Sequence, residues 1–164
     1  MYTSEQHASH IQRELEKYSQ SVVNELRKVT QFTFHSEIDL LDFTAFPQVL
    51  DLSITMFSMD RDANEVFGEE CRSDEFAGSF TISEEVNYNY LSEEEEDAFW
   101  EFYEENEKVE EAEHKAIASW FYSCWLGAGG SSIKLPSYFS FHDHDLCLDL
   151  HQNKWISDGD KWFE

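Results

Sequence analysis

Residues 92–127 read SEEEEDAFWEFYEENEKVEEAEHKAIASWFYSCWLG and carry the longest helical pattern in the chain. Ser92 with Glu95 three residues later is a capping box, and the acidic run that follows falls in the first turn, where the helix dipole favours negative charge. Apolar residues then recur at helical spacing until Gly127, a helix stop signal. These residues are Phe99, Phe102, Tyr103, Val109, Ala112, Ala116, Ile117, Trp120 and Cys124. The pattern predicts either one acidic helix of about 35 residues or two helices with a bend near Asn106.

The same region is almost uniformly negative. Between residues 84 and 113 the sequence has 14 Asp and Glu residues and one Lys. A solvated helix face usually alternates charge signs, because like charges four residues apart destabilise a helix. We therefore predict a binding surface with aromatic side chains as apolar anchors. The predicted partner-binding residues are Glu93, Glu94, Trp100, Glu101, Tyr103, Glu104, Glu105 and Glu107. The alternative interpretation is a solvated helix face.

A second helical pattern opens the chain. Apolar residues at helical spacing predict one amphipathic helix from about Glu5 to Lys28. Its stripe consists of Ile11, Leu15, Tyr18, Val22, Leu26 and Val29. We expect this helix and the acidic helix to pack together on one face of a sheet. The expected packing residues are Leu15, Val22, Leu26, Phe102, Val109, Ile117 and Trp120.

Strand patterns fill most of the remaining chain. Apolar and polar residues alternate in short segments, as expected for half-buried strands. These segments are residues 31–35, 50–59, 75–90, 138–141, 146–150 and 154–156, and residues 75–90 are long enough for either one or two strands. Residues 36–48 are also apolar, but they contain Pro47, so we expect a loop or an irregular edge strand there. Residues 60–73 are predicted to form a charged connection and residues 127–132 a flexible one.

The order of these patterns predicts an α+β fold. We expect a single antiparallel β-sheet covered by two or three helices, one of them the long acidic helix. An apolar share of 41% and an aromatic share of 16% exclude a disordered acidic tail. The 164 residues contain no internal repeat and no linker, which predicts a single domain, residues 1–164.

Net charge is the outlying property of the composition. The chain has 35 Asp and Glu residues against 11 Lys and Arg residues, a formal net charge of −24. Nucleic acid is an unfavourable direct ligand, because proteins bind it mainly by neutralising phosphates with Lys and Arg. A basic protein is the expected partner, since a one-sign field speeds encounter with positive surfaces. Charge that serves only solubility, or a salt-rich habitat, is the alternative.

Two groups of residues suggest chemistry, and each also has a simpler interpretation. His142, Asp143, His144 and Asp145, with Asp149 and His151 nearby, are residue types that bind divalent metals. A polar segment between two apolar strands is also typical of a solvated turn, and we predict that turn and no metal. Cys71, Cys124 and Cys147 are too widely spaced for a disulfide framework, and we expect reduced, mostly buried thiols.

No catalytic residue, cofactor or membrane segment is predicted. Residues 127–132 are rich in Gly and Ser, but they lack the Lys of a phosphate-binding loop and follow a helix instead of a strand. The first residues lack a signal-peptide pattern, and no apolar run reaches the length of about 20 residues that spans a membrane. These features predict a cytoplasmic protein. The sequence makes no prediction of oligomeric state.

The order of elements and the charge resemble those of a known class of proteins. A leading helix, a strand meander, a long acidic helix and a closing aromatic hairpin resemble the immunity proteins of bacterial polymorphic and contact-dependent toxin systems. The resemblance implies a toxin–antitoxin role, in which the protein covers the active or substrate-binding surface of a basic toxin such as a nuclease. It does not carry over any site residue.

Two other functions remain open at this point. A DNA-mimic inhibitor would place carboxylates in two rows along an elongated body, whereas a toxin inhibitor would gather them in one patch. A small metal- or Cys-dependent enzyme would need polar groups that converge in a pocket. If the acidic helix is only a solvated face, the second candidate surface is the C-terminal aromatic hairpin around Tyr138, Phe141, Trp155 and Trp162.

Overall fold

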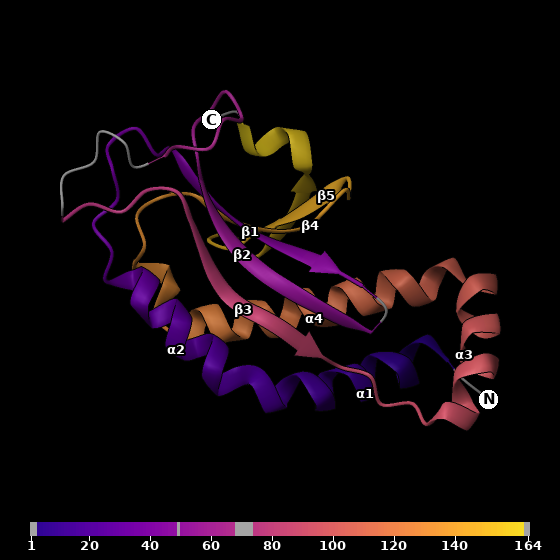
Figure 1. Ribbon diagram of the computed structural model, residues 1–164. Helices are drawn as coiled ribbons and strands as arrows, with labels where there is room; N and C mark the ends of the chain where they lie inside the picture. Colours follow the sequence, from indigo (N-terminus) through magenta and orange to yellow (C-terminus); the bar gives the residue numbers. More distant parts are fainter. Residues whose placement is uncertain (1–2, 49, 68–73, 163–164) are drawn as a thin grey trace.

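A computed structural model describes residues 3–48, 50–67 and 74–162. One six-stranded sheet in the order β3-β2-β1-β4-β5-β6 is packed against helices, so the mixed helix and sheet composition is confirmed (Figure 1). The strands are β1 Leu40–Pro47, β2 Asp51–Met59, β3 Ser79–Asn87, β4 Ser137–Phe141, β5 Leu146–Asp149 and β6 Lys154–Ser157. The helices are α1 Ser4–Leu15, α2 Ser19–Thr30, α3 Glu93–Glu105 and α4 Glu107–Gly127, with 3-10 turns η1 Glu16–Tyr18, η3 Gly130–Ser132 and η4 Asp158–Trp162. In the described part of the chain, no helix is long and apolar enough to span a membrane.

The sheet is mixed, and the prediction of a purely antiparallel sheet was wrong. β1 pairs with β4 in parallel, from Leu41 opposite Ser137 to Ala45 opposite Phe141. All other neighbouring strands are antiparallel. The sheet therefore consists of two local meanders, β1–β3 and β4–β6, joined edge to edge. Alternation along a strand predicts each meander but does not show which edges meet or in which direction.

The central strand β1 was predicted to be a loop or an edge strand. Its residues 40–45 are all buried, because the strand is covered on both faces and therefore lacks the alternation of a half-buried strand. Pro47 is the last residue of the strand and does not interrupt the ladder. The strand predicted at residues 31–35 is also wrong, since the segment makes only an isolated bridge between Phe34 and Phe76.

The N-terminal helix is divided into α1 and α2 by the 3-10 turn η1, where a single helix was predicted. The break redirects the chain so that α1 packs along α4, while α2 packs on both α4 and β3. In Figure 1 these helices and α4 lie on one side of the sheet. The expected packing face is confirmed for Leu15, Val22, Leu26, Val109, Ile117 and Trp120, all of which are buried. Phe102 is only half-buried.

The acidic helical region contains two helices, as the second alternative from the sequence predicted. Asn106 separates α3 from α4 with an extended backbone, φ −130° and ψ 97°. In Figure 1, α3 stands across the end of α4 instead of continuing it. The capping box at the start of α3 is not formed as expected, because the Ser92 hydroxyl donates to Glu95 Oε1 at 2.8 Å and does not accept from a backbone N–H.

The Gly-rich connector is ordered by close packing. Gly129 adopts a left-handed conformation with φ 86° and ends the turn after α4. A Cβ atom on Gly130 would lie 2.4 Å from the Trp125 ring, so only glycine fits there. The 3-10 turn η3 therefore replaces the flexible connection that the sequence predicted.

Candidate functional site

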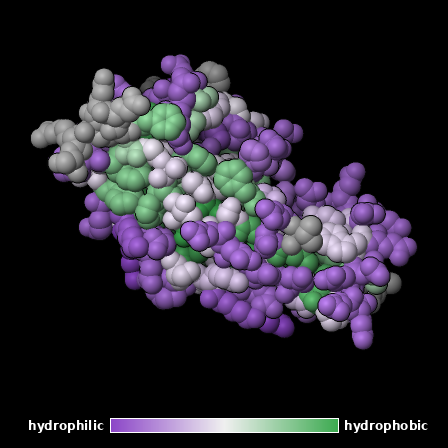
Figure 2. Space-filling view, viewed as in Figure 1, coloured by the Kyte–Doolittle hydropathy of each residue, from purple (hydrophilic) through white to green (hydrophobic). Residues whose placement is uncertain are grey.

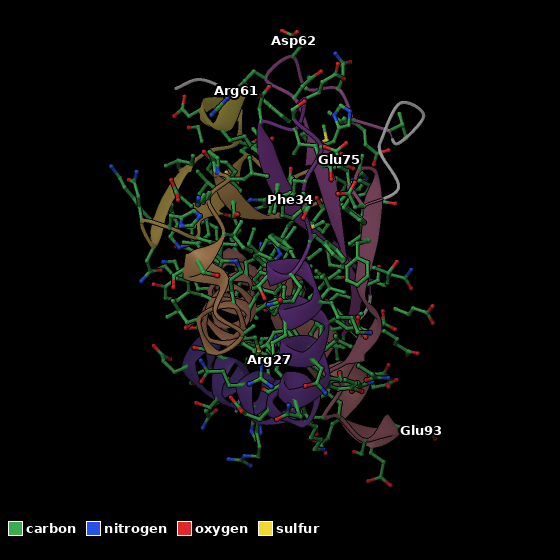
Figure 3. All side chains as sticks on the ribbon, turned by 90° about the vertical axis from the view of Figure 1, so that its left-hand side faces the viewer. Arg27, Phe34, Arg61, Asp62, Glu75 and Glu93 are labelled. Atoms are coloured by element: carbon green, nitrogen blue, oxygen red, sulfur yellow. The ribbon has the colours of Figure 1, made fainter. Side chains whose placement is uncertain are left out.

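The predicted acidic residues lie on the outside of α3 and at the start of α4. Glu93, Glu94, Glu101, Glu104, Glu105 and Glu107 are all exposed. Within the described residues, none of these six carboxylates takes part in an ion pair. Hydrophilic side chains dominate the end of the molecule where α3 lies (Figure 2), and Glu93 lies at the opposite end from Arg61 and Asp62 (Figure 3). These residues form one negative surface, which we call the α3–α4 acidic surface.

Few positive charges compensate this surface. Lys115 Nζ lies 2.8 Å from Glu111 Oε1, and this hydrogen bond, followed by the charge of Lys115, lowers the pKa of Glu111. His114 Nε2 lies 3.9 Å from Glu110 Oε1. The pKa of His114 is below its ordinary value, first because the ring is partly buried and second because His144 lies beside it. His114 is therefore mainly neutral at pH 7, and the surface keeps its negative sign.

Next to the acidic surface runs a groove of about 740 Å³, which we call the α4 groove. Glu107, Glu110, Glu111, His114 and Lys115 form its α4 side, and His144, Leu146 and Trp155 of the C-terminal strands form the other side. Leu146 is 43% exposed and provides apolar area there. The His114 ring stacks on Phe141 at 4.0 Å, which fixes the imidazole in the wall. The groove thus combines carboxylates with apolar contact area.

This arrangement joins two regions that the sequence presented as alternatives. The acidic helix and the C-terminal hairpin face each other across the α4 groove. Of the four hairpin residues named from the sequence, Tyr138 and Phe141 are buried, while Trp155 and Trp162 are partly exposed. Only Trp155 lines the groove. No local pattern shows this neighbourhood, because it depends on the sheet order that places β5 and β6 beside α4.

The predicted aromatic residues Trp100 and Tyr103 line a second, smaller hollow of about 270 Å³. We call it the Trp100 hollow. Its walls include Leu50 before β2, Tyr88 after β3, Trp100 and Tyr103 of α3, and Glu110, Glu113 and His114 of α4. Glu110 and His114 also line the α4 groove, so the two cavities adjoin along one face of α4.

Glu113 is the buried carboxylate of this hollow, with 5% of its surface exposed. The Tyr103 hydroxyl donates to Glu113 Oε2 at 2.8 Å, and His7 Nε2 lies 3.9 Å from Oε1. Burial, and then the charge of Glu113, raise the pKa values of both Tyr88 and Tyr103. Both phenols therefore stay protonated at physiological pH and can donate hydrogen bonds. The sequence analysis did not single out Glu113, although its helical spacing from Val109 and Ile117 places it on the apolar stripe of α4.

A second buried carboxylate, Asp42, lies in β1 on the opposite face of the sheet from the helices. Lys161 Nζ of η4 donates to Asp42 Oδ2 and to Asp158 Oδ1, both at 2.6 Å. Ser140 and Thr44 hydroxyls donate to Asp42 Oδ1 at 2.7 and 3.2 Å. Burial alone would lower the pKa of Lys161, but the charge of Asp42 and the two hydrogen bonds outweigh it and raise that pKa. The cluster anchors η4 to the sheet.

The histidine-rich segment forms the predicted turn between β4 and β5. Asp143 has a positive φ of 62°, and His142 Nε2 lies 3.3 Å from the carboxylate of that residue. The ring of His142 packs against Phe46, and His144 Nδ1 accepts the Leu146 N–H at 3.3 Å. No group of three or more metal-ligating side chains occurs among the residues that the structure describes. That this turn binds no metal stays a prediction.

A Cys-dependent enzyme would need a reactive thiol, and the two cysteines that the structure describes are both buried. Cys124 and Cys147 are free and buried, and Cys71 lies outside the described residues. Burial is the main reason that the pKa of Cys124 rises to about 11 and that of Cys147 to about 12. A thiol with such a pKa is almost fully protonated at pH 7 and is a poor nucleophile.

An apolar cluster at the other end of the molecule was not singled out from the sequence. Phe32, Phe34, Phe76 and Phe80 are half-buried, and the Phe32 and Phe76 rings stack at 4.4 Å. Hydrophobic side chains gather over this half of the molecule in Figure 2. Because these rings pack against one another and against the main core, we interpret the cluster as an extension of the core.

No protein-family model, curated protein or solved structure matches this chain. The resemblance to immunity proteins therefore stays a prediction.

Proposed function

We propose that this protein binds a basic protein partner through the α3–α4 acidic surface and the α4 groove, and thereby blocks that partner. In this proposal it is an inhibitor of the immunity type that acts in the cytoplasm on a basic toxin domain such as a nuclease. The observation that carries the proposal is the set of exposed, unpaired carboxylates beside a groove lined by Leu146 and Trp155.

The two parts of the site have different physical roles in this proposal. The one-sign field of the carboxylates attracts a positive partner and speeds association, an effect that salt weakens. Apolar contact with Leu146 and Trp155 slows dissociation, because buried aromatic and aliphatic anchors contribute most of the binding energy of an interface. The acidic surface alone would give fast but weak and salt-sensitive binding.

The bend at Asn106 favours an inhibitor with one acidic patch over a DNA mimic. A DNA mimic needs carboxylates at phosphate-like spacing along an extended line. Here α3 turns across the end of α4, so the carboxylates do not follow one straight helix, and Glu107, Glu110 and Glu111 of α4 line the groove beside them (Figure 1). This arrangement supports an inhibitor that binds its protein partner through one patch.

The proposal is tested with two charge variants of equal net charge. The first replaces Glu101, Glu104, Glu105 and Glu107 by Lys on the acidic surface. The matched control replaces Glu37, Asp62, Glu84 and Asp160 by Lys at exposed positions outside α3 and α4. Each protein is immobilised and exposed to an extract of the native host, and the retained proteins are identified.

A basic protein that the parent and the matched control retain, and that the first variant loses, is the expected result. Equal retention by all three proteins would show that the acidic surface is only a solvated face. Loss from both variants would show that net charge alone governs binding, and this too would contradict a defined site.

A further inference from the structure

We propose that the Trp100 hollow is a receptor for a single guanidinium group, the side chain of an arginine. The source of that arginine, a residue of the basic partner, rests on the proposed function. The chemistry of the hollow does not, and it is tested separately below.

The walls of the hollow are aromatic. The ring centroids of Trp100 and Tyr103 lie 5.5 Å apart with a 66° angle between their planes, so the two rings present faces in different directions. Tyr88 is almost fully buried behind them. Aromatic faces attract cations electrostatically, and a guanidinium is especially suited because it also stacks on rings. The walls therefore favour a planar cation over an anion or a water-filled space.

The charge inside the hollow is not fully compensated. Glu113 is buried, yet the two phenols that hydrogen-bond to it, those of Tyr103 and Tyr88, are neutral. The nearest basic group is His7, 3.9 Å away and beyond hydrogen-bonding distance. The side chain of His7 is fully buried, and its Nε2 atom has no hydrogen-bond partner among the described residues. A buried carboxylate in this state is costly, and an entering cation would lower that cost.

The second carboxylate, Glu110, is positioned at the mouth of the hollow. Its side chain is 56% exposed and also borders the α4 groove. A guanidinium has five N–H donors, enough to contact one buried and one exposed carboxylate at once. An anion would be repelled by both carboxylates, and a neutral side chain would leave the charge of Glu113 uncompensated.

The position of the hollow fits a side chain that enters from a bound polypeptide. Glu110 and His114 are one helical turn apart and line both the hollow and the α4 groove. A segment of the partner lying in the groove would therefore reach the hollow across this turn of α4. The groove supplies contact area, and the hollow supplies selection for arginine.

The test uses Nα-acetyl-arginine amide and its neutral isostere Nα-acetyl-citrulline amide, followed by NMR. The Trp100 indole N–H signal, assigned with the Trp100→Phe variant, should shift on titration with the arginine compound. We expect the citrulline compound to bind at least about tenfold more weakly, because it keeps the shape but loses the charge-assisted contacts. Equal binding of the two compounds, or no shift of the Trp100 signal with the arginine compound, would overturn the proposal.

Three substitutions complete the test. Glu113→Gln and Glu110→Gln should each weaken binding of the arginine compound several-fold, whereas Glu37→Gln, an exposed change in the loop before β1 and outside both cavities, should leave it unchanged. If Glu113→Gln perturbs the fold, the exposed Glu110→Gln variant decides the outcome. Unchanged binding in Glu110→Gln and in a folded Glu113→Gln protein would contradict the assignment.

This test and the test of the proposed function can fail independently. If arginine binds in the hollow but the partner binds the charge-reversed variant as tightly as the parent, the receptor is supported and the proposed function is contradicted. If the partner requires the acidic surface but arginine does not bind in the hollow, the proposed function is supported and the receptor is contradicted.

Discussion

Two buried carboxylates, Asp42 and Glu113, have opposite surroundings. Asp42 is 7% exposed and has a lysine ammonium and two hydroxyl groups within hydrogen-bonding distance. Glu113 is 5% exposed, has the neutral phenols of Tyr103 and Tyr88 as hydrogen-bond partners, and has His7 at 3.9 Å. Asp42 is closed in by η4, whereas Glu113 borders a hollow. The two carboxylates are therefore buried to a similar extent, but only Asp42 has a hydrogen-bonded lysine ammonium to neutralise its charge.

The difference separates a structural carboxylate from a binding one. The charge of Asp42 is neutralised within the chain, so this group ties β1, β4 and η4 together. The charge of Glu113 is stabilised only in part, so it remains available to a cation from outside. The formal net charge of the chain is −24, so a negative side chain is not in itself a sign of a binding site. A buried carboxylate without a hydrogen-bonded cation, such as Glu113, is a more specific sign.

Removing the cation of Asp42 should produce the largest effect. Lys161→Met leaves a buried carboxylate without its ion pair, which typically costs about 3–5 kcal/mol of unfolding free energy. Urea unfolding measures this cost. The matched change Lys154→Met, at an exposed lysine, should stay within about 0.5 kcal/mol. If Lys161→Met costs no more than Lys154→Met, the Asp42 cluster does not anchor η4.

The isosteric changes Asp42→Asn and Glu113→Gln compare the two carboxylates directly. Asp42→Asn removes the negative charge that faces Lys161 and should cost more stability than Glu113→Gln. Glu113→Gln still accepts from Tyr103 and removes an incompletely compensated charge, so we expect a change below about 1.5 kcal/mol. Urea unfolding of both variants at pH 7 measures the difference. An equal or larger cost for Glu113→Gln would mean that Glu113 is compensated as fully as Asp42.

The two regions should also differ in pH dependence. His114 beside the hollow has a lowered pKa, so the unfolded chain binds its proton more readily and stability falls as the pH drops below about 6.5. Lys161 has a raised pKa, so its contribution is complete at neutral pH and is lost only as the pH rises through the folded-state value. His114→Gln should therefore lose less stability than the parent between pH 7 and pH 5. Parallel stability curves for the two proteins would remove His114 as the cause.

The smallest expected effect concerns the thiols, which lie on opposite faces of the sheet. Cys147 neighbours the Asp42 cluster and Cys124 belongs to the helix layer, and burial raises both pKa values. Iodoacetamide at pH 8 should label neither residue in the native protein and both after unfolding, as peptide mass spectrometry will show. Rapid native labelling of Cys124 or Cys147 would reopen the Cys-dependent enzyme alternative.

The sequence predicted the parts of this fold that depend on local patterns. The helical stripe through Leu15 and Ile117 and the turn at His142 follow from local pattern, and the break near Asn106 was one of two alternatives that the pattern left open. β1 was missed because a strand buried on both faces lacks alternation, and Pro47 at its end suggested an interruption. The parallel pairing of β1 with β4 was missed because pattern does not specify which meander edges meet.

Of the candidate site, too, the sequence predicted only the part that depends on local pattern. The exposed carboxylates of α3 follow from composition, since a one-sign helix face is visible in the sequence. The α4 groove and the burial of Glu113 depend on tertiary contacts with Trp155, Tyr103 and His7. The spacing of Glu113, four residues from both Val109 and Ile117, is the sequence signal that could have distinguished it from the exposed Glu110.

The most direct test of the account measures the association rate of the purified partner with the parent, the α3–α4 charge-reversed variant and the matched control, at low and high salt. We expect the parent and the control to associate rapidly at low salt and to slow as salt rises, while the reversed variant associates slowly at both. Equal rates and equal salt dependence for all three proteins would contradict the claim that α3 and α4 form the binding surface.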